Sequence, residues 1–123
     1  MTTNEIDKKE ISAIIEAMQE RKAKDIVSLD LRPIGTSICD YFIICNADST
    51  TQVGAICDFV EEEMYDKCGR DTKRKQGREN GFWVILDYWN IVVHILQSEY
   101  RDFYRLEDLW ADAPKMTYSQ NQE

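Results

Sequence analysis

The feature that most constrains the fold is a continuous apolar run, Tyr41–Cys45 (YFIIC), followed within a few residues by a helix-start signal. A run that is apolar at successive positions is typical of a strand covered on both faces of its sheet. Ser49-Thr50-Thr51-Gln52 then forms a capping box, and apolar residues at helical spacing continue toward Gly69, which suits the end of a helix. A buried strand followed by a helix predicts a helical crossover and therefore a mixed sheet.

Hydrophobic periodicity places the other elements along the chain. They are an amphipathic helix over about 5–22, a half-buried strand over 25–31, two β-prone runs over 82–86 and 91–96 joined by a hairpin, and a helix over about 99–111. The predicted order is α-β-β-α-(β)-β-β-α, an α/β (α+β) fold with a mixed β-sheet flanked by helices. With 123 residues, we expect a single domain over 1–113 and a flexible polar tail over 114–123.

The charge balance bears on the class of partner. The chain has 15 Lys and Arg residues against 23 Asp and Glu residues, a net charge of −8. Phosphate backbones repel such a chain, so binding of nucleic acid or anionic lipid over the whole surface is excluded, although a local patch is not. Residues 70–79 carry five cations and two acids, a net +3, which leaves −11 for the rest. The simplest interpretation of this loop is a solvated turn, because it has neither an anion-binding glycine pattern nor aromatics between its cations.

Targeting and metal-binding signals are absent from the sequence. No stretch is apolar enough to span a membrane, and the N-terminus is polar and acidic, without the pattern of a secretory signal. The cysteines, Cys39, Cys45, Cys57 and Cys68, form no C-x-x-C pair, and His94 is the one histidine. We therefore expect reduced thiols, no bound metal, no cofactor and a cytoplasmic location.

The sequence gives little indication of an enzymatic function. Gly35-Thr36-Ser37 before a strand loosely resembles the nucleotidyltransferases, in which that strand bears carboxylates for magnesium. Here the strand is apolar, and Asp40 and Asp87 at strand ends are too few for a two-metal site. His94 lies within an apolar run, where a structural or interface histidine is the more frequent case than a catalytic base. We predict that the protein is not an enzyme.

The C-terminal third is rich in large aromatic residues interleaved with acids. The aromatics are Trp83, Tyr88, Trp89, Tyr100, Tyr104 and Trp110. Part of this set must form core in a domain of this size. Tyr and Trp beside carboxylates are also typical of a binding hot spot for a basic protein, and the sequence favours that interpretation for the remainder.

Motifs in the same region resemble the ribosomal silencing factor (RsfS, Iojap-like) family. They are a W-hhh-D strand at Phe82–Tyr88, a VVH strand at Val92–Ile95 and an R-x-FY-x-LE-x-LW helix at Arg101–Trp110. The segments Asp25–Leu31 and Asp40–Cys45 are similar to the family's first two strands. The chain departs from the family pattern where Gln76-Gly77 replaces Glu-Gly, where Trp89-Asn90 replaces a Gly-acid turn, and where Leu96 replaces a frequent Phe.

The resemblance implies a nucleotidyltransferase-like fold without catalytic activity. Members of the family bind a basic protein of the large ribosomal subunit, number fourteen, on the intersubunit face. They thereby block joining of the small subunit and repress translation when nutrients are scarce. The residues that we expect at or beside this contact are Trp83, Asp87, Tyr104, Glu107 and Trp110, with His94 and Asp40 as further members.

Two alternatives and one additional property stay open. The chain could be a small nucleotidyltransferase that uses Asp40, Asp87 and a further acidic residue. It could instead be a large-subunit assembly factor that contacts rRNA through loop 70–79, with Lys73, Arg74 and Lys75 as the contact residues. An aromatic-rich surface would also favour a homodimer when the ribosome is absent.

Overall fold

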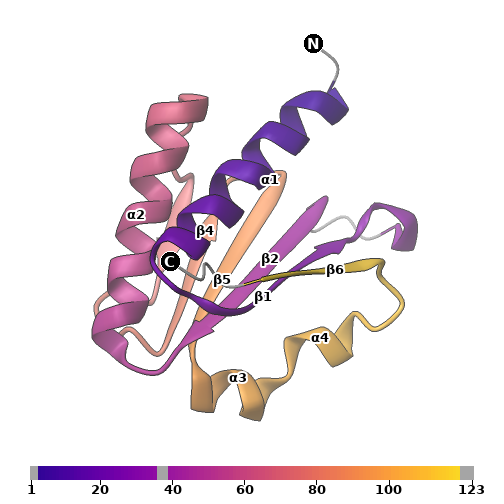
Figure 1. Cartoon of the computed structure of the whole chain (residues 1–123). Coiled ribbons are helices and arrows are strands. Elements are labelled where there is room, and N and C mark those ends of the chain that lie inside the picture. The colour runs from indigo at the N-terminus through magenta and orange to yellow at the C-terminus, as the bar shows by residue number, and fades with distance from the viewer. Residues whose placement is uncertain (1–2, 36–38, 120–123) are drawn as a thin grey trace.

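A computed structural model of the chain describes residues 3–35 and 39–119 (Figure 1). Its elements in chain order are α1 (Thr3–Glu20), β1 (Lys24–Asp30), the 3-10 turn η1 (Arg32–Ile34), β2 (Tyr41–Ala47), α2 (Thr50–Cys68), β3 (Arg74–Gln76), β4 (Trp83–Asp87), β5 (Ile91–Gln97), α3 (Ser98–Tyr104), α4 (Leu106–Leu109) and β6 (Lys115–Tyr118). Within these residues, no helix is both long and apolar enough to cross a membrane.

The strands form one mixed sheet in the order β3-β4-β5-β2-β1-β6. The central pair β2 and β5 is parallel, and every other pair is antiparallel. Parallel neighbours need a crossover, and α2 begins the connection that returns the chain to the sheet. The predicted mixed sheet flanked by helices is confirmed.

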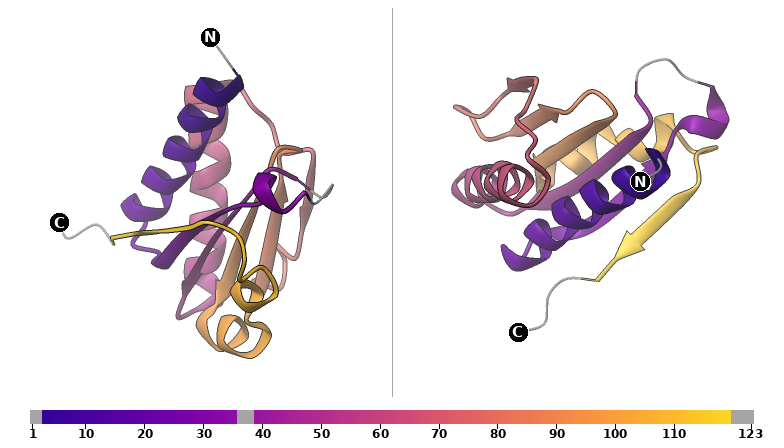
Figure 2. Two further views of the ribbon diagram at one scale, coloured as in Figure 1. Left: turned by 90° about the vertical axis from the view of Figure 1, so that its right-hand side faces the viewer. Right: turned by 90° about the horizontal axis from the view of Figure 1, so that it is seen from above.

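Helices α1 and α2 cover one face of the sheet, and α3 and α4 lie on the other (Figure 2). We call these the first face and the second face. Every residue of β2 is buried, because side chains on both of its faces are covered. The apolar run that suggested a doubly covered strand therefore lies at the centre of the sheet, between the two apolar clusters.

The predicted ends of α2 are also found. Ser49 is the N-cap, and its side chain accepts a hydrogen bond of 3.1 Å from the backbone N–H of Gln52. Gly69 follows the last turn with φ of 64°, a left-handed conformation that glycine adopts without strain. Local sequence signals were sufficient here because both ends depend on residues adjacent in the chain.

Three local expectations need correction. The helix expected over 99–111 is two short helices, since Arg105 between them has φ of 50° and cannot continue a right-handed helix. The strand at 25–31 is not half-buried, because Ile26 joins the core cluster under α1. Lys115–Tyr118, expected to be a flexible tail, forms β6 and pairs with β1, which would otherwise leave its backbone groups unpaired at the sheet edge.

Some predicted features fall outside the described residues. These are Thr36 and Ser37 of the Gly-Thr-Ser turn, Met1 and Thr2 of the polar N-terminus, and residues 120–123 of the tail.

Candidate protein-binding surface

Five rings gather on the second face, four of them within helices or strands and one in the segment after α4; we call them the ring cluster. They are Phe42 on β2, Trp83 on β4, His94 on β5, Tyr104 on α3 and Trp110 after α4. Ring centroids are 4.7 Å apart for Phe42 and His94, 5.8 Å for Phe42 and Trp110, and 4.9 Å for Trp83 and Tyr104. Four of these residues were expected from the sequence. Phe42 was not, because its position within a continuous apolar run gives no sign of which face of the sheet it occupies.

A hydrogen bond fixes the state of the histidine in this cluster. Trp83 Nε1–H donates to His94 Nδ1 over 3.1 Å. Nδ1 is therefore the acceptor, so Nε2 carries the proton in the neutral ring, and Nε2 is buried without a partner among the described residues. Burial lowers the pKa of His94 to about 4. At neutral pH this side chain is an uncharged ring that holds Trp83 in place.

The ring cluster is partly core and partly surface. Trp83 and Trp110 are half-buried against the apolar cluster of the second face. Tyr104 is 47% exposed, and the neighbouring side chains Phe103 and Leu109 are 79% and 72% exposed. An uncovered apolar strip on an otherwise charged protein is a feature of binding surfaces.

Glu107 has a structural partner within the chain. Its carboxylate pairs with the buried guanidinium of Arg101 at 3.0 Å. Arg101 also donates to Asn46 Oδ1 at 2.8 Å and to the backbone oxygen of Asp25. This network fastens α3 and α4 to the ends of β1 and β2. Neither Arg101 nor Asn46 was expected as a site residue from the sequence, because no local pattern marks a buried hydrogen bond between distant residues.

Asp40 and Asp87 lie at the opposite end of the sheet from Tyr104. Asp87 faces Val92 in the β4–β5 register, whereas Trp83 faces Leu96. Asp40 is anchored there by its backbone N–H, which donates to Asn90 O over 3.0 Å. Within the described residues neither carboxylate forms an ion pair, although Arg74 is the cross-strand neighbour of Asp87 and the Lys73 backbone N–H donates to Asp87 O over 2.8 Å.

The same geometry bears on the enzymatic alternative. The pKa of the nearby Cys39 thiol is raised to about 11, mainly by burial. The negative charges of Asp40 and Asp87 raise this pKa further. The side chains of β2 between them and the ring cluster are apolar. A two-metal centre needs more carboxylates than this end of the sheet supplies.

The basic segment 70–79 is largely neutralised by acids of the chain itself. Arg78 makes two hydrogen bonds of 2.9 and 3.0 Å to Asp58, and Lys75 pairs with Glu61 at 3.0 Å. Arg70 pairs with the buried Glu10 at 2.6 Å. In the part of the chain that the structure describes, Lys73 and Arg74 are the cations of this segment without such a partner.

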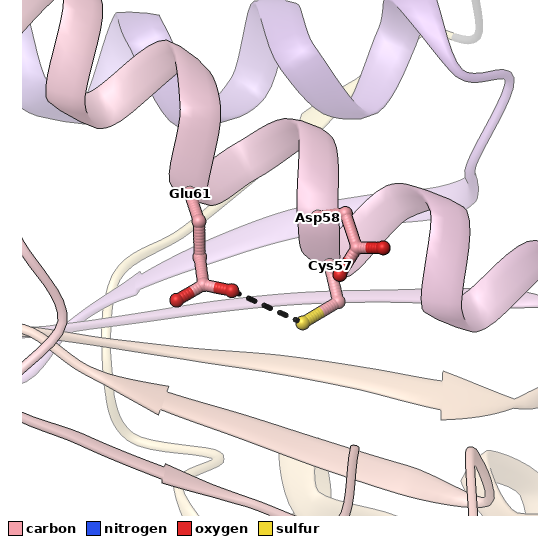
Figure 3. Close-up of side chains that lie close together, drawn as sticks. All are labelled: Cys57, Asp58 and Glu61. Carbon is pink, nitrogen blue, oxygen red and sulfur yellow. Dashed lines mark hydrogen bonds between the residues drawn. The ribbon is translucent and has the colours of Figure 1, made fainter. Parts of the chain in front are cut away.

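The carboxylates that bind these cations also form a compact group with a cysteine. Cys57, Asp58 and Glu61 have ligand atoms within 4.8 Å of one another (Figure 3). Asp58 and Glu61 already bind Arg78 and Lys75, and burial raises the pKa of the Cys57 thiol to about 12. A thiol that stays protonated and carboxylates already paired with cations do not favour a metal ion.

These features define the class of protein: an α+β domain that presents a half-exposed aromatic surface with acidic flanks on one face of its sheet, as protein-binding domains do. Over residues 3–123 the chain matches the family model described as "Ribosomal silencing factor during starvation". The chain therefore belongs to the ribosomal silencing factor family, as its motifs indicated.

Individual relatives agree with this assignment. The RsfS protein of Bacillus subtilis is 37% identical over 98 residues, which is 80% of this chain and 81% of that protein. The RsfS protein of Halalkalibacterium halodurans is 36% identical over 100 residues, covering 81% and 84% of the two chains. A crystal structure from Chromobacterium violaceum is similar with a TM-score of 0.77 and 35% identity, covering 90% and 88%. The two relatives are named as silencing factors and not as enzymes.

Proposed function

We propose that this protein binds ribosomal protein fourteen on the intersubunit face of the large ribosomal subunit and blocks joining of the small subunit. The action is steric: the bound domain occupies space that the small subunit needs, and no bond is made or broken. The result is repression of translation under nutrient limitation. Membership of the ribosomal silencing factor family supports this proposal.

The observation that carries the proposal is the ring cluster. Its rings are held by contacts within the chain, yet Tyr104 remains about half exposed, and Phe103 beside it is largely uncovered. Rigid aromatic side chains lose little entropy on binding, and this makes them effective anchors. Packing within the fold does not require Tyr104 and Phe103 to be exposed.

Charge favours a protein target over bare RNA. The chain has a net charge of −8, and Asp40 and Asp87 on the second face form no ion pair among the described residues. A basic ribosomal protein matches this surface, whereas phosphate backbones are repelled by it.

The test uses Tyr104→Ala, because Tyr104 is the exposed ring of the cluster. We expect this variant to lose co-sedimentation with large subunits while its far-UV circular dichroism stays unchanged. Tyr65→Ala is the matched control, since Tyr65 is 59% exposed but lies on α2, which packs on the first face. Wild-type binding by Tyr104→Ala would refute the proposed surface. Glu107→Lys is a poor probe, because it would place a second cation beside the buried Arg101.

The steric step needs its own measurement. Purified large and small subunits are mixed with the protein, and the fraction of joined ribosomes is measured on a sucrose gradient. We expect wild-type protein to reduce that fraction and Tyr104→Ala to leave it unchanged. A wild-type protein that binds large subunits without reducing joining would contradict the steric mechanism.

A peripheral rRNA contact is a second candidate, favoured by Lys73 and Arg74, which form no ion pair with any residue that the structure describes. Both are exposed, whereas Lys75 is held by Glu61. Replacing Lys73 and Arg74 by Gln should lower the salt dependence of subunit binding by about two counterions, according to the slope expected per phosphate contact. An unchanged slope would exclude this contact.

Self-association in the absence of ribosomes is the remaining part of the proposal. The exposed Phe103 and Leu109 would be covered in a homodimer. Light scattering at increasing concentration should show a rise from monomer to dimer mass, and a constant monomer mass would contradict it.

A further inference from the structure

Trp89, at the turn between β4 and β5, has an unusual backbone conformation. Its φ is 82°, in the left-handed region that glycine adopts freely and bulky side chains avoid. The turn is held on both sides. Asp87 Oδ1 accepts the Trp89 N–H at 2.8 Å, and the Asn90 side chain donates to Asp7 and Glu10 at 3.0 Å. The neighbours therefore impose the strained conformation on Trp89.

The Trp89 side chain makes few contacts that would stabilise the fold. It is 74% exposed, and the structure records no ring or cation contact for it among the described residues. Tyr88, the preceding residue, is by contrast completely buried. A strained position whose side chain is not used within the fold is an observation that points to a function outside it.

The surroundings of Trp89 indicate which chemistry it would meet. Asp87 and Asp40 lie at the same end of the second face and form no ion pair within the described residues. Cations lie near the turn as well. Arg74 is the cross-strand neighbour of Asp87 without forming an ion pair with it, and Arg70, which pairs with Glu10, donates to Tyr88 O and Asn90 Oδ1. An exposed indole beside two carboxylates that form no ion pair among the described residues suits an arginine, whose planar guanidinium can stack on the ring and donate to a carboxylate.

We propose that Trp89 is a second anchor for the partner protein: it receives a basic side chain, arginine foremost, of a basic protein segment, with Asp87 and Asp40 pairing its charge. This inference rests on the proposed function, since it assumes the same ribosomal-protein partner. It adds a contact at the end of the sheet opposite Tyr104. The complex thus spans the second face from the ring cluster to the β4–β5 turn.

The test variant is Trp89→Gly. Glycine relieves the left-handed strain, so the Tm should equal or exceed that of the wild type, because the relief offsets the extra backbone entropy of glycine. The Kd for large subunits should nevertheless rise by about tenfold or more, as expected for loss of an aromatic anchor. Trp89→Asn, which also tolerates this backbone, should give the same loss of affinity.

Lys22→Gly is the matched control. Lys22 has φ of 61° after α1, so the substitution relieves comparable strain without touching the turn. We expect its Kd to equal that of the wild type. Asp87→Asn should weaken binding, and its effect should be less than additive with Trp89→Gly, because both would contact the same basic side chain.

The outcomes separate the two proposals. Wild-type affinity for both Trp89 variants, with Tyr104→Ala still defective, would overturn the anchor and leave the proposed function standing. Loss of affinity in the Trp89 variants with Tyr104→Ala unaffected would support the anchor and overturn the ring cluster. Absence of subunit binding by the wild type would overturn both. Trp89-dependent binding to naked rRNA would also overturn the anchor, because it would show base stacking instead of recognition of a basic protein.

Discussion

Protonation of His94 is expected to destabilise the fold, and the size of the effect follows from its environment. The imidazole is buried, Nδ1 accepts the Trp83 indole proton at 3.1 Å, and Nε2 has no partner among the described residues. Adding a proton would place a charge in this apolar site and convert Nδ1 from an acceptor into a donor facing another donor. Burial accordingly lowers the pKa of His94 from 6.5 to about 4.

The sign of the pH dependence follows from this direction. Between about pH 6.5 and pH 4 the unfolded chain binds the proton and the folded chain does not, so the free energy of unfolding falls as pH falls. The contribution is fully present above pH 6.5. At pH 5 about 2 kcal/mol is lost, since each pKa unit corresponds to about 1.4 kcal/mol and most of the window has been crossed. Well below pH 4, where His94 is protonated in both the folded and the unfolded chain, its contribution to the free energy of unfolding no longer changes with pH.

Urea unfolding at pH 8, 6 and 5 measures this loss. The window avoids the carboxyl groups of Asp30, Asp48 and Asp58, whose pKa values are lowered below 3.8 by hydrogen bonds from Arg32, Lys24 and Arg78. His94→Asn is the matched control, because its Oδ1 can accept the same indole proton but does not titrate.

NMR gives a direct second measurement. The chain has one histidine, so the imidazole resonance in the folded protein needs no assignment, and it should titrate near pH 4. An ordinary titration near pH 6.5 would refute the reasoning. Equal pH dependence for wild type and His94→Asn between pH 8 and pH 5 would refute it independently.

Two further predictions concern stability. Gly77→Ala should cost about 3 kcal/mol in urea unfolding, because at φ of 81° its Cβ would lie 2.0 Å from the Trp83 carbonyl oxygen. Gly35→Ala, at φ of 78° with no atom within 4 Å of its Cβ, should cost only about 1–2 kcal/mol, and equal costs would contradict the clash. Arg101→Met should cost about 2–3 kcal/mol by leaving Asn46 Oδ1 without its guanidinium donor, and should speed proteolysis between α3 and α4. Unchanged cleavage there would show that Arg101 does not fasten this segment.

Several signals formed by residues close together in the chain predicted the structure correctly, although the helix expected over 99–111 is divided at Arg105. Continuous apolarity predicted that β2 is covered on both faces, and Ser49 and Gly69 marked the ends of α2. The C-terminal motifs were enough to identify the family. Each of these signals depends on residues within one element or at its ends, where side-chain pattern and backbone conformation are coupled directly.

What the sequence by itself determined is the set of elements, the mixed sheet and the family; the tertiary structure decided which residues act together. Phe42 and Trp110 meet across 68 positions of chain, and Arg101 reaches Asn46 across 55. An ion pair with Glu61 on α2 gave the exposed Lys75 a partner within the chain, and pairing with β1 made a strand of residues expected to be a tail. The physical reason is that such contacts depend on the packing of distant segments, whereas periodicity and capping report on neighbours along the chain alone.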